Sequence, residues 1–167
     1  MEGAAYLLFL EENPGLEKRM DDIIDLISSA QKKDGYLYVG HITGVSSGIS
    51  NKIKDPTIFD RKPNEVDLAK NTMVWMMGDR PYSNVIHSHE LYNMGHMYEG
   101  AIAYYQATGK DKWLKVAEKS AQHINKVFFE GDPNYNNGKP VNQAPGHQEL
   151  ELALTKLYRI TGNKLYL

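Results

Sequence analysis

Residues 103–109 have the sequence Ala-Tyr-Tyr-Gln-Ala-Thr-Gly, and residues 156–162 repeat the pattern as Lys-Leu-Tyr-Arg-Ile-Thr-Gly, at an offset of 53 residues (156 − 103). An earlier copy lies at residues 2–7, where Glu-Gly-Ala-Ala-Tyr-Leu aligns with residues 99–104. Repetition at a fixed spacing indicates that one supersecondary unit is built several times. We therefore expect three copies of one unit along the chain.

The middle copy is predicted to be a pair of helices joined by a tight turn. The first helix, from about Glu90 to Ala107, is apolar around most of its circumference and ends at Thr108-Gly109, where glycine supplies the left-handed residue after a helix. The second, from about Asp111 to Phe128, is apolar on one face only. A helix that is apolar all round is a buried one, whereas an amphipathic helix lies at the surface.

The first copy follows the same order. Residues 4–10 form the longest apolar stretch of the chain and have the length of a buried helix. After the Asn13-Pro14-Gly15 turn, apolar residues recur at helical spacing, namely Leu16, Met20, Ile23, Ile24, Ile27 and Ala30. The third copy begins near His147 and is cut off at Leu167.

Buried helices that alternate with amphipathic ones predict two concentric rings of helices. We expect an all-α fold, a partial (α/α)6 toroid of about three helical hairpins at about 2–31, 90–128 and 147–167, the last truncated. Residues 1–167 are interpreted as a fragment of one toroid catalytic domain. An open helical solenoid would give a similar periodicity, but its repeats are usually about 34–47 residues long.

The composition argues against several classes of partner. The 19 basic and 21 acidic residues give a net charge of −2, and without a basic patch neither nucleic acid nor an anionic membrane is an expected partner. No apolar stretch approaches the roughly 20 residues that cross a bilayer. The chain has no cysteine, which excludes disulfides and thiolate ligands to zinc within it. No signal peptide follows Met1, and the sequence assigns no compartment.

Polar residues gather where the helix from about Glu90 begins. Residues 87–99 hold three of the six histidines and two carboxylates, near long loops at about 32–65 and 129–146. Long loops at one rim of a scaffold commonly build a binding site. A second polar cluster, at residues 144–151, opens the next buried helix in the same relative place. We therefore expect His89 and His147 to face one cavity.

These clusters fit a sugar better than a metal. Neutral imidazoles offer donors and acceptors to hydroxyl groups, and Tyr92 or Tyr98 could stack on a sugar ring. His87 and His89 have the spacing of some metal-binding pairs, but the start of a helix favours hydrogen bonding and capping instead. In the alternative interpretation, each histidine only satisfies its own helix.

Two further patterns bear on the chemistry. Asp132-Pro-Asn-Tyr-Asn136 matches the first half of a calcium loop, but the glycine and the glutamate that the loop requires are missing, so a polar turn is favoured. Paired carboxylates are the minimum for ordinary glycoside hydrolysis. Four glutamates are candidates by position only: Glu90, Glu99, Glu149 and Glu151.

Three motifs occur in order along the chain: Ala30-Gln-Lys-Lys-Asp-Gly-Tyr-Leu37, His89-Glu-Leu-Tyr-Asn-Met-Gly-His96, and Pro145-Gly-His-Gln-Glu149. With them, nearly the whole chain resembles the bacterial β-L-arabinofuranosidases of glycoside hydrolase family 127 and relatives. The resemblance implies an α/α six-hairpin barrel and a glycosidase that removes arabinofuranose from plant polysaccharides or glycoprotein glycans. It also matches His89 and His147 to the family's sugar-contacting histidines, with Gln148 a weaker candidate beside them.

The same resemblance implies groups that this chain lacks. The family uses a cysteine nucleophile, a zinc site of cysteines and a glutamate, and a glutamate acid/base, all in later helices. We therefore expect no catalytic residue, metal ligand or cofactor in residues 1–167, with zinc left to the full-length parent. The fragment alone should be inactive and, because its inner helices would expose an apolar edge, should self-associate.

Two other functions remain open on the sequence alone. Another toroid sugar enzyme, an unsaturated glycuronyl hydrolase or a polysaccharide lyase, would place a catalytic carboxylate or histidine in these residues. A non-catalytic helical scaffold would bind protein and leave the rim histidines exposed and unpaired.

Overall fold

The computed structural model describes residues 1–42, 78 and 80–167, and within these ranges every regular element is a helix. The loop predicted at about 32–65 therefore lies largely outside the described residues. The longer helices are α1 (Glu2–Leu10), α2 (Pro14–Ala30), α7 (Glu90–Thr108), α8 (Lys112–Asn125) and α9 (Glu149–Thr161). The short ones are α3 (Val39–Ile42), α6 (Val85–Ser88), the π-helical turn η3 (Lys126–Glu130), and the 3-10 turns η4 (Asn136–Gly138) and η5 (Lys164–Tyr166).

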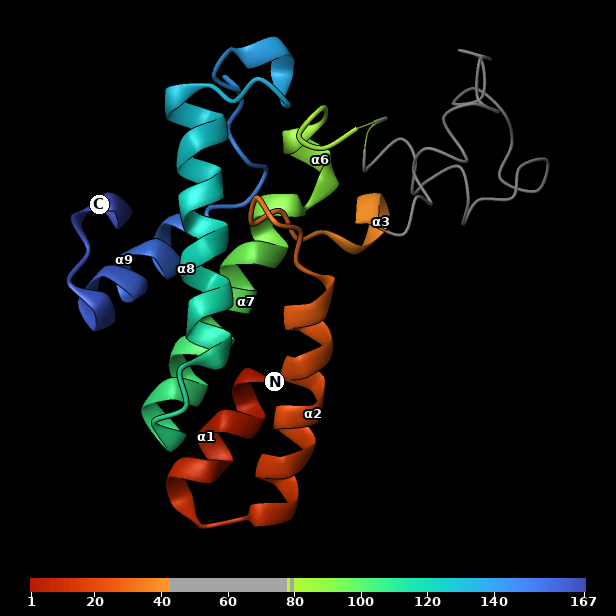
Figure 1. Cartoon of the computed structure of the whole chain (residues 1–167). Coiled ribbons are helices and arrows are strands. Elements are labelled where there is room, and N and C mark those ends of the chain that lie inside the picture. Colours follow the sequence, from red (N-terminus) through yellow and green to blue (C-terminus); the bar gives the residue numbers. More distant parts are fainter. Residues whose placement is uncertain (43–77, 79) are drawn as a thin grey trace, which may run out of the picture.

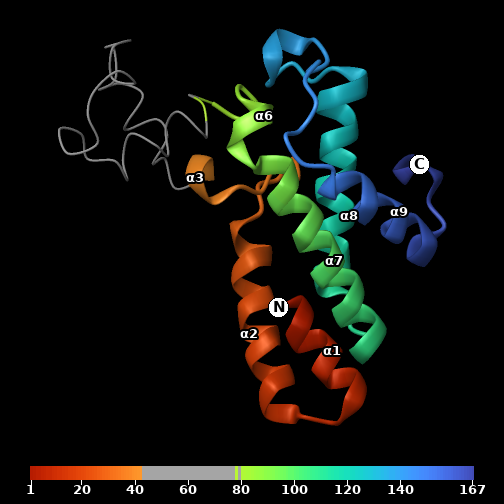
Figure 2. The ribbon, with the colours of Figure 1, turned by 180° about the vertical axis from the view of Figure 1, so that it is seen from behind.

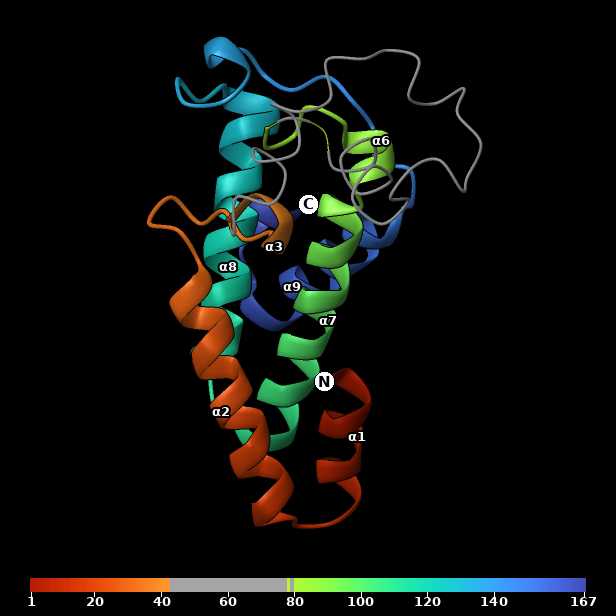
Figure 3. The ribbon, with the colours of Figure 1, turned by 90° about the vertical axis from the view of Figure 1, so that its right-hand side faces the viewer.

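Two helical hairpins lie side by side, α1 with α2 and α7 with α8 (Figure 1). Their turns are at the lower end of Figure 1, whereas α6 and the segment that follows α8 are at the upper end. Turned to the side, α2 and α8 form one layer and α1 and α7 another (Figure 3). From behind, α9 is seen next to the upper half of α7, against which it packs (Figure 2).

Helix α7 is the buried centre of this arrangement, as its sequence predicts. Tyr98 and Ala101 are completely buried, and so are most of their neighbours along the helix. A Cβ atom on Gly100 would lie 2.6 Å from the ring of Trp113 on α8, so glycine permits the two helices to approach closely. The helix ends at Gly109, whose φ of 72° is the left-handed conformation expected there.

The second hairpin differs from the prediction at its far end. The helix predicted to reach Phe128 ends as an α-helix at Asn125 and continues as a π-helical turn to Glu130. Gly131, with a φ of 87°, then ends the turn. A π-turn adds a residue to the hydrogen-bonded ring, and the helical segment runs on to Glu130, just past the predicted end at Phe128.

In the first hairpin, the structure agrees with the prediction for α2 and differs from it for α1. On α2, Asn13 caps the first turn through a hydrogen bond from the Leu16 amide, and Met20 and Ile24 are buried as predicted. On α1, however, Ala5 is the one fully buried residue. The prediction of a buried helix at residues 4–10 is wrong for the described structure, because α1 packs on α7 from one side only. None of the described helices combines the length and the apolarity that a bilayer span needs.

Candidate functional site

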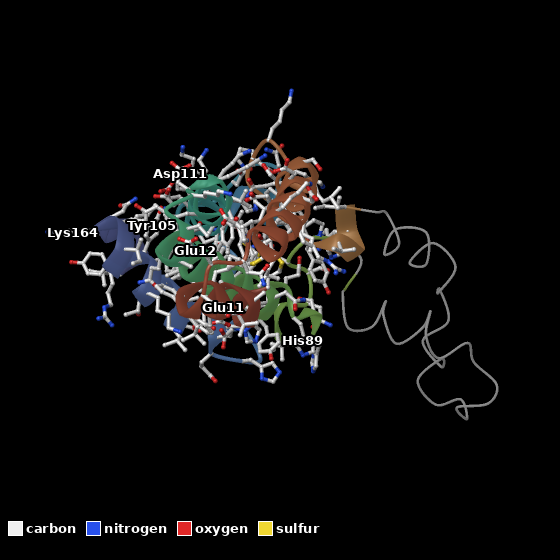
Figure 4. The ribbon with its side chains drawn as sticks, turned by 90° about the horizontal axis from the view of Figure 1, so that it is seen from below. Glu11, Glu12, His89, Tyr105, Asp111 and Lys164 are labelled. Atoms are coloured by element: carbon white, nitrogen blue, oxygen red, sulfur yellow. The ribbon has the colours of Figure 1, made fainter. Side chains whose placement is uncertain are left out.

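His89 lies between α6 and α7, at the upper end of the molecule. It ends α6 and begins α7 with φ 57° and ψ 16°, a left-handed conformation that is rare for a residue other than glycine. Holding such a residue costs on the order of 1–3 kcal/mol, and backbone strain of this kind is concentrated at functional sites. In the view from below, His89 lies at the edge of the helical body, on the side away from Asp111 (Figure 4).

His147 reaches the same place from the loop before α9. A Cβ atom on the preceding Gly146 would lie 2.3 Å from the carbonyl oxygen of Ile86, so glycine lets this loop pass directly against α6. Gln148 follows as the residue before the first turn of α9, with a non-helical φ of −83° and ψ of 38°. The side chains of His147 and Gln148 are exposed.

Four aromatic side chains form what we call the rim cluster: His89, Tyr92, His96 and His147. The imidazoles of His89 and His147 stack, with centroids 5.3 Å apart. Tyr92 lies 5.7 Å from the ring of His89 and 5.0 Å from that of His147. His96 completes the group with its ring edge-on to Tyr92 at 4.5 Å. The structure thus brings the rings of His89 and His147 together; that they face one sugar cavity stays a prediction.

Other residues that the sequence singled out lie away from the rim cluster. Tyr98, the alternative stacking residue, is completely buried, and its hydroxyl donates to Ser120 Oγ at 2.9 Å. It points into the core because it lies on the face of α7 that meets α8. His87 is exposed, with Nδ1 3.1 Å from Oδ1 of Asn84, the residue that precedes the same short helix. The calcium-like segment forms a polar turn in which Asp132 Oδ1 accepts from the Asn134 amide.

A second group of polar side chains, which we call the charged layer, begins at His96 of the rim cluster and adds Glu99, Glu149 and Lys156. His96 Nδ1 is 3.2 Å from Glu149 Oε1 and 3.8 Å from Glu99 Oε2. Glu99 also forms an ion pair with Lys156 of α9. A Cβ atom on Gly95 would lie 2.7 Å from Glu149 Cγ and 2.8 Å from its carbonyl carbon, so glycine allows α7 and α9 to approach at this level.

The two carboxyl groups of this layer have pKa values that are shifted in opposite directions. The hydrogen bond to Glu99, with partial burial, raises the pKa of Glu149. Burial also acts to raise the pKa of Glu99, but the hydrogen bonds from Glu149 and Lys156 outweigh it and lower the pKa. Glu149 therefore holds a proton more tightly than Glu99 does. Two carboxylates this close cannot both ionise without repulsion.

The charged layer has some of the features of a metal site. One ligand atom each from His96, Glu99 and Glu149 lies within 4.8 Å of the other two, which is wider than ligands spaced around zinc at about 2.0–2.2 Å from the metal. The ammonium of Lys156, however, already provides the positive charge beside Glu99. The set also has no thiolate, because the chain has no cysteine, so it does not match the zinc site of cysteines and glutamate that the resemblance implies.

Glu90 is enclosed directly behind His89. Its side chain is 1% exposed, so it cannot be the accessible catalytic carboxylate that its position in the sequence allows. Glu90 Oε1 accepts from the Tyr36 hydroxyl at 2.6 Å and from the Tyr82 amide at 3.2 Å. Burial raises the pKa of the Glu90 carboxyl, and its hydrogen bonds from Tyr36, Ser88 and the Tyr82 amide oppose that shift.

Sequence reasoning missed the aromatic side chains that surround Glu90. Tyr36 and Tyr82 meet edge to face at 5.4 Å, and Tyr135 lies 5.8 Å from Tyr82 and 4.9 Å from His123. These residues come from four separate segments, so no local pattern places them together. The one usable signal was the concentration of tyrosines in the loops before and after the long helices.

A cavity of about 320 Å³ lies between α1, α7 and α9. Glu99 and Lys156 line it, and neither His89 nor His147 does. The remaining lining residues are Glu2, Tyr6, Ile102, Ala103, Gln106, Arg159 and Ile160. This cavity is thus separate from the rim cluster and adjoins the charged layer instead.

The helical hairpins and the polar rim place the chain in the class of (α/α)6-toroid proteins, of which it forms one part. The family model described as β-L-arabinofuranosidase, GH127 catalytic domain, matches residues 1–167. The chain therefore belongs to the GH127 family.

Relatives of known activity or structure agree with this assignment. A non-reducing end β-L-arabinofuranosidase of Bifidobacterium longum is 38% identical over 168 residues, covering 100% of this chain and 20% of that protein. The crystal structure of a GH127 β-L-arabinofuranosidase from Geobacillus stearothermophilus T6 superimposes with a TM-score of 0.66 at 37% identity, covering 99% of this chain and 20% of its own. A GH127 β-arabinofuranosidase gives a TM-score of 0.72 at 34% identity, with coverages of 99% and 21%. The chain thus spans about a fifth of the length of these relatives.

Proposed function

We propose that the protein to which this chain belongs is a glycoside hydrolase that releases a terminal β-L-arabinofuranose from plant polysaccharides or glycoprotein glycans. Residues 1–167 supply part of its sugar pocket. The observation that carries the proposal is the stacked pair of His89 and His147, with Tyr92 beside both rings. The proposal draws its substrate from the GH127 relatives, which are β-L-arabinofuranosidases.

The chemistry of the rim cluster supports a sugar ligand. A furanose presents hydroxyl groups, which need both donors and acceptors, and one apolar face, which packs on an aromatic ring. Each neutral imidazole has one donor and one acceptor nitrogen, so His89 and His147 can satisfy two neighbouring hydroxyls. Tyr92 offers the aromatic surface, and Gln148 is exposed where it can add an amide.

The reactive groups are proposed to lie elsewhere in the protein. Glu90 is buried, Glu99 is held by Lys156, and Glu149 faces His96. Glu151 is exposed on the first turn of α9. None of the four forms an accessible carboxylate pair at the rim cluster, so we assign the described part of the chain to binding and not to bond cleavage. Zinc, where the complete protein holds it, would be bound by residues outside this chain.

The test is turnover of p-nitrophenyl β-L-arabinofuranoside by the intact protein. His89→Ala and His147→Ala are each expected to lower kcat/KM by about tenfold to a hundredfold, since each removes one or two hydrogen bonds to the sugar. His87→Ala is the matched control, because it removes an exposed histidine two residues away that faces Asn84. Its kcat/KM should stay within about twofold of the wild type.

Two outcomes would contradict the proposal. If His89→Ala and His147→Ala keep full activity on the arabinofuranoside, the rim cluster does not bind the sugar. Turnover of an unsaturated glucuronide in place of the arabinofuranoside would instead favour another toroid sugar enzyme. If calorimetry detects binding of neither sugar, the helical-scaffold function gains support.

A further inference from the structure

We propose that Glu90 is a positioning residue: with Ser88 and Tyr36 it locks His89 in its left-handed backbone conformation and so aims the imidazole at His147. This inference rests on the proposed function for its effect on sugar binding. Its structural content, the conformation of His89, can be tested without any substrate.

The two residues that flank His89 are bonded to each other. Ser88 Oγ donates to Glu90 Oε2 at 2.9 Å and accepts from the Glu90 amide at 3.3 Å. Both side chains are 1% exposed. The residue between them is therefore part of a small closed loop of hydrogen bonds, in which His89 has little freedom to change φ or ψ.

Contacts from distant segments fix this loop in place. The Tyr36 hydroxyl donates to Glu90 Oε1 at 2.6 Å, and the Tyr38 hydroxyl donates to the Ser88 carbonyl oxygen at 2.6 Å. The Tyr82 amide donates to the Glu90 carboxyl from another direction. Partners from residues 36–38 and from residue 82 thus hold both sides of His89.

This set of contacts explains why a carboxyl group is kept inside an aromatic environment. Burying an acid is unfavourable, so a buried acid with several partners is expected where it fixes a geometry. A leucine of similar size would fill the space but could accept none of these hydrogen bonds. The left-handed residue would then lose its restraint, and relaxation of His89 would turn its ring away from His147.

The experiment compares three substitutions in the intact protein by crystallography and by kinetics. Tyr36→Phe removes one hydrogen bond to Glu90 and keeps the ring. Glu90→Leu removes all of them, and Glu90→Gln keeps a side-chain oxygen that can accept. Tyr105→Phe, on the same helix and far from the rim, is the control.

Tyr36→Phe and Glu90→Leu are expected to separate the His89 and His147 rings and to raise KM by about tenfold, with kcat within about twofold, because displacements near 1 Å are costly for binding geometry. Glu90→Gln keeps only one of the two accepting oxygens, so its ring separation and its KM should lie between those of the wild type and of Glu90→Leu. If Glu90→Leu fails to fold, the ring separation and the KM of Tyr36→Phe alone test the inference.

Two results would overturn the inference. One is a left-handed, stacked His89 in the structure of Tyr36→Phe or Glu90→Leu. The other is a wild-type KM in Tyr36→Phe while His89→Ala raises KM. If the wild type shows no activity on arabinofuranosides and the ring stack is nevertheless lost in Tyr36→Phe, the proposed function fails and the positioning role stands.

Discussion

The imidazole rings of His89 and His147 stack with centroids 5.3 Å apart and planes inclined by only 21°. His89 follows α6 and His147 precedes α9. The distance between their rings therefore depends on how these two segments pack together. A change in either segment is therefore expected to reach both rings.

A double-mutant cycle should reveal energetic coupling between the two histidines. Because each ring restricts the other, His89→Ala and His147→Ala together are expected to lose less sugar affinity than the sum of the single losses, with a coupling of about 1 kcal/mol. Calorimetric titration with L-arabinose measures it. His89→Ala combined with His87→Ala should be additive, and additivity of both pairs would contradict the coupling.

The stability of the protein should depend on pH through Glu90. Burial raises its pKa in the folded state, so the folded protein holds this proton more tightly than the unfolded chain does. Its contribution to the free energy of unfolding is therefore full below the ordinary glutamate pKa and is lost as the pH rises through the folded value. Denaturant unfolding at a series of pH values measures this slope.

Glu90→Gln provides the control for that pH dependence. The amide does not titrate, so the slope attributable to Glu90 should disappear while the other groups keep theirs. An unchanged pH profile in Glu90→Gln would show that Glu90 is ionised equally easily in the folded and unfolded states.

Gly95→Ala should weaken the contact between α7 and α9. The added Cβ atom would lie 2.7–2.9 Å from Glu149, including its backbone carbon and oxygen, and overpacking of this kind costs about 1–3 kcal/mol. Gly3→Ala is the matched helical control, because its Cβ atom meets nothing within 4 Å. It should be neutral or stabilise by up to about 1 kcal/mol. Equal unfolding free energies for the two variants would contradict the close approach.

A polypeptide of residues 1–167 is expected to self-associate through α1. Tyr6, Leu7, Phe9 and Leu10 are each at least half exposed, and Leu10 reaches 81%. Sedimentation should show a concentration-dependent increase in mass, and Leu7→Lys with Leu10→Lys should reduce it. Leu26→Lys on α2, at an isolated residue that is 69% exposed, is the control. A monodisperse monomer at all concentrations would contradict the prediction.

The helical architecture could be predicted from the sequence because it depends on local periodicity. The helix end at Gly109 adopts the expected left-handed conformation, with φ 72°, and Gly162 at the equivalent place in the repeat has φ 70°. Burial was predicted less well. Apolar residues in α1 are exposed among the described residues, because burial depends on which neighbours a helix meets and not on its own sequence.

The candidate site was predicted in part. The repeat placed His89 and His147 at equivalent helix starts, and the structure brings their rings together; their role in sugar binding stays a prediction. The choice between Tyr92 and Tyr98 could not be made, because it depends on which face of α7 meets α8. Glu90 was selected as a candidate for catalysis and proves to be buried.

By itself, the sequence determined the all-helical class, the hairpin repeat and the two rim histidines, since helical periodicity and turn residues act over a few positions along the chain. Only the tertiary structure decided that the pKa of Glu149 is raised and that of Glu99 lowered, and that Tyr36, Ser88 and Tyr82 enclose Glu90. These features depend on distances between segments far apart in the chain, because charge repulsion and burial act through space.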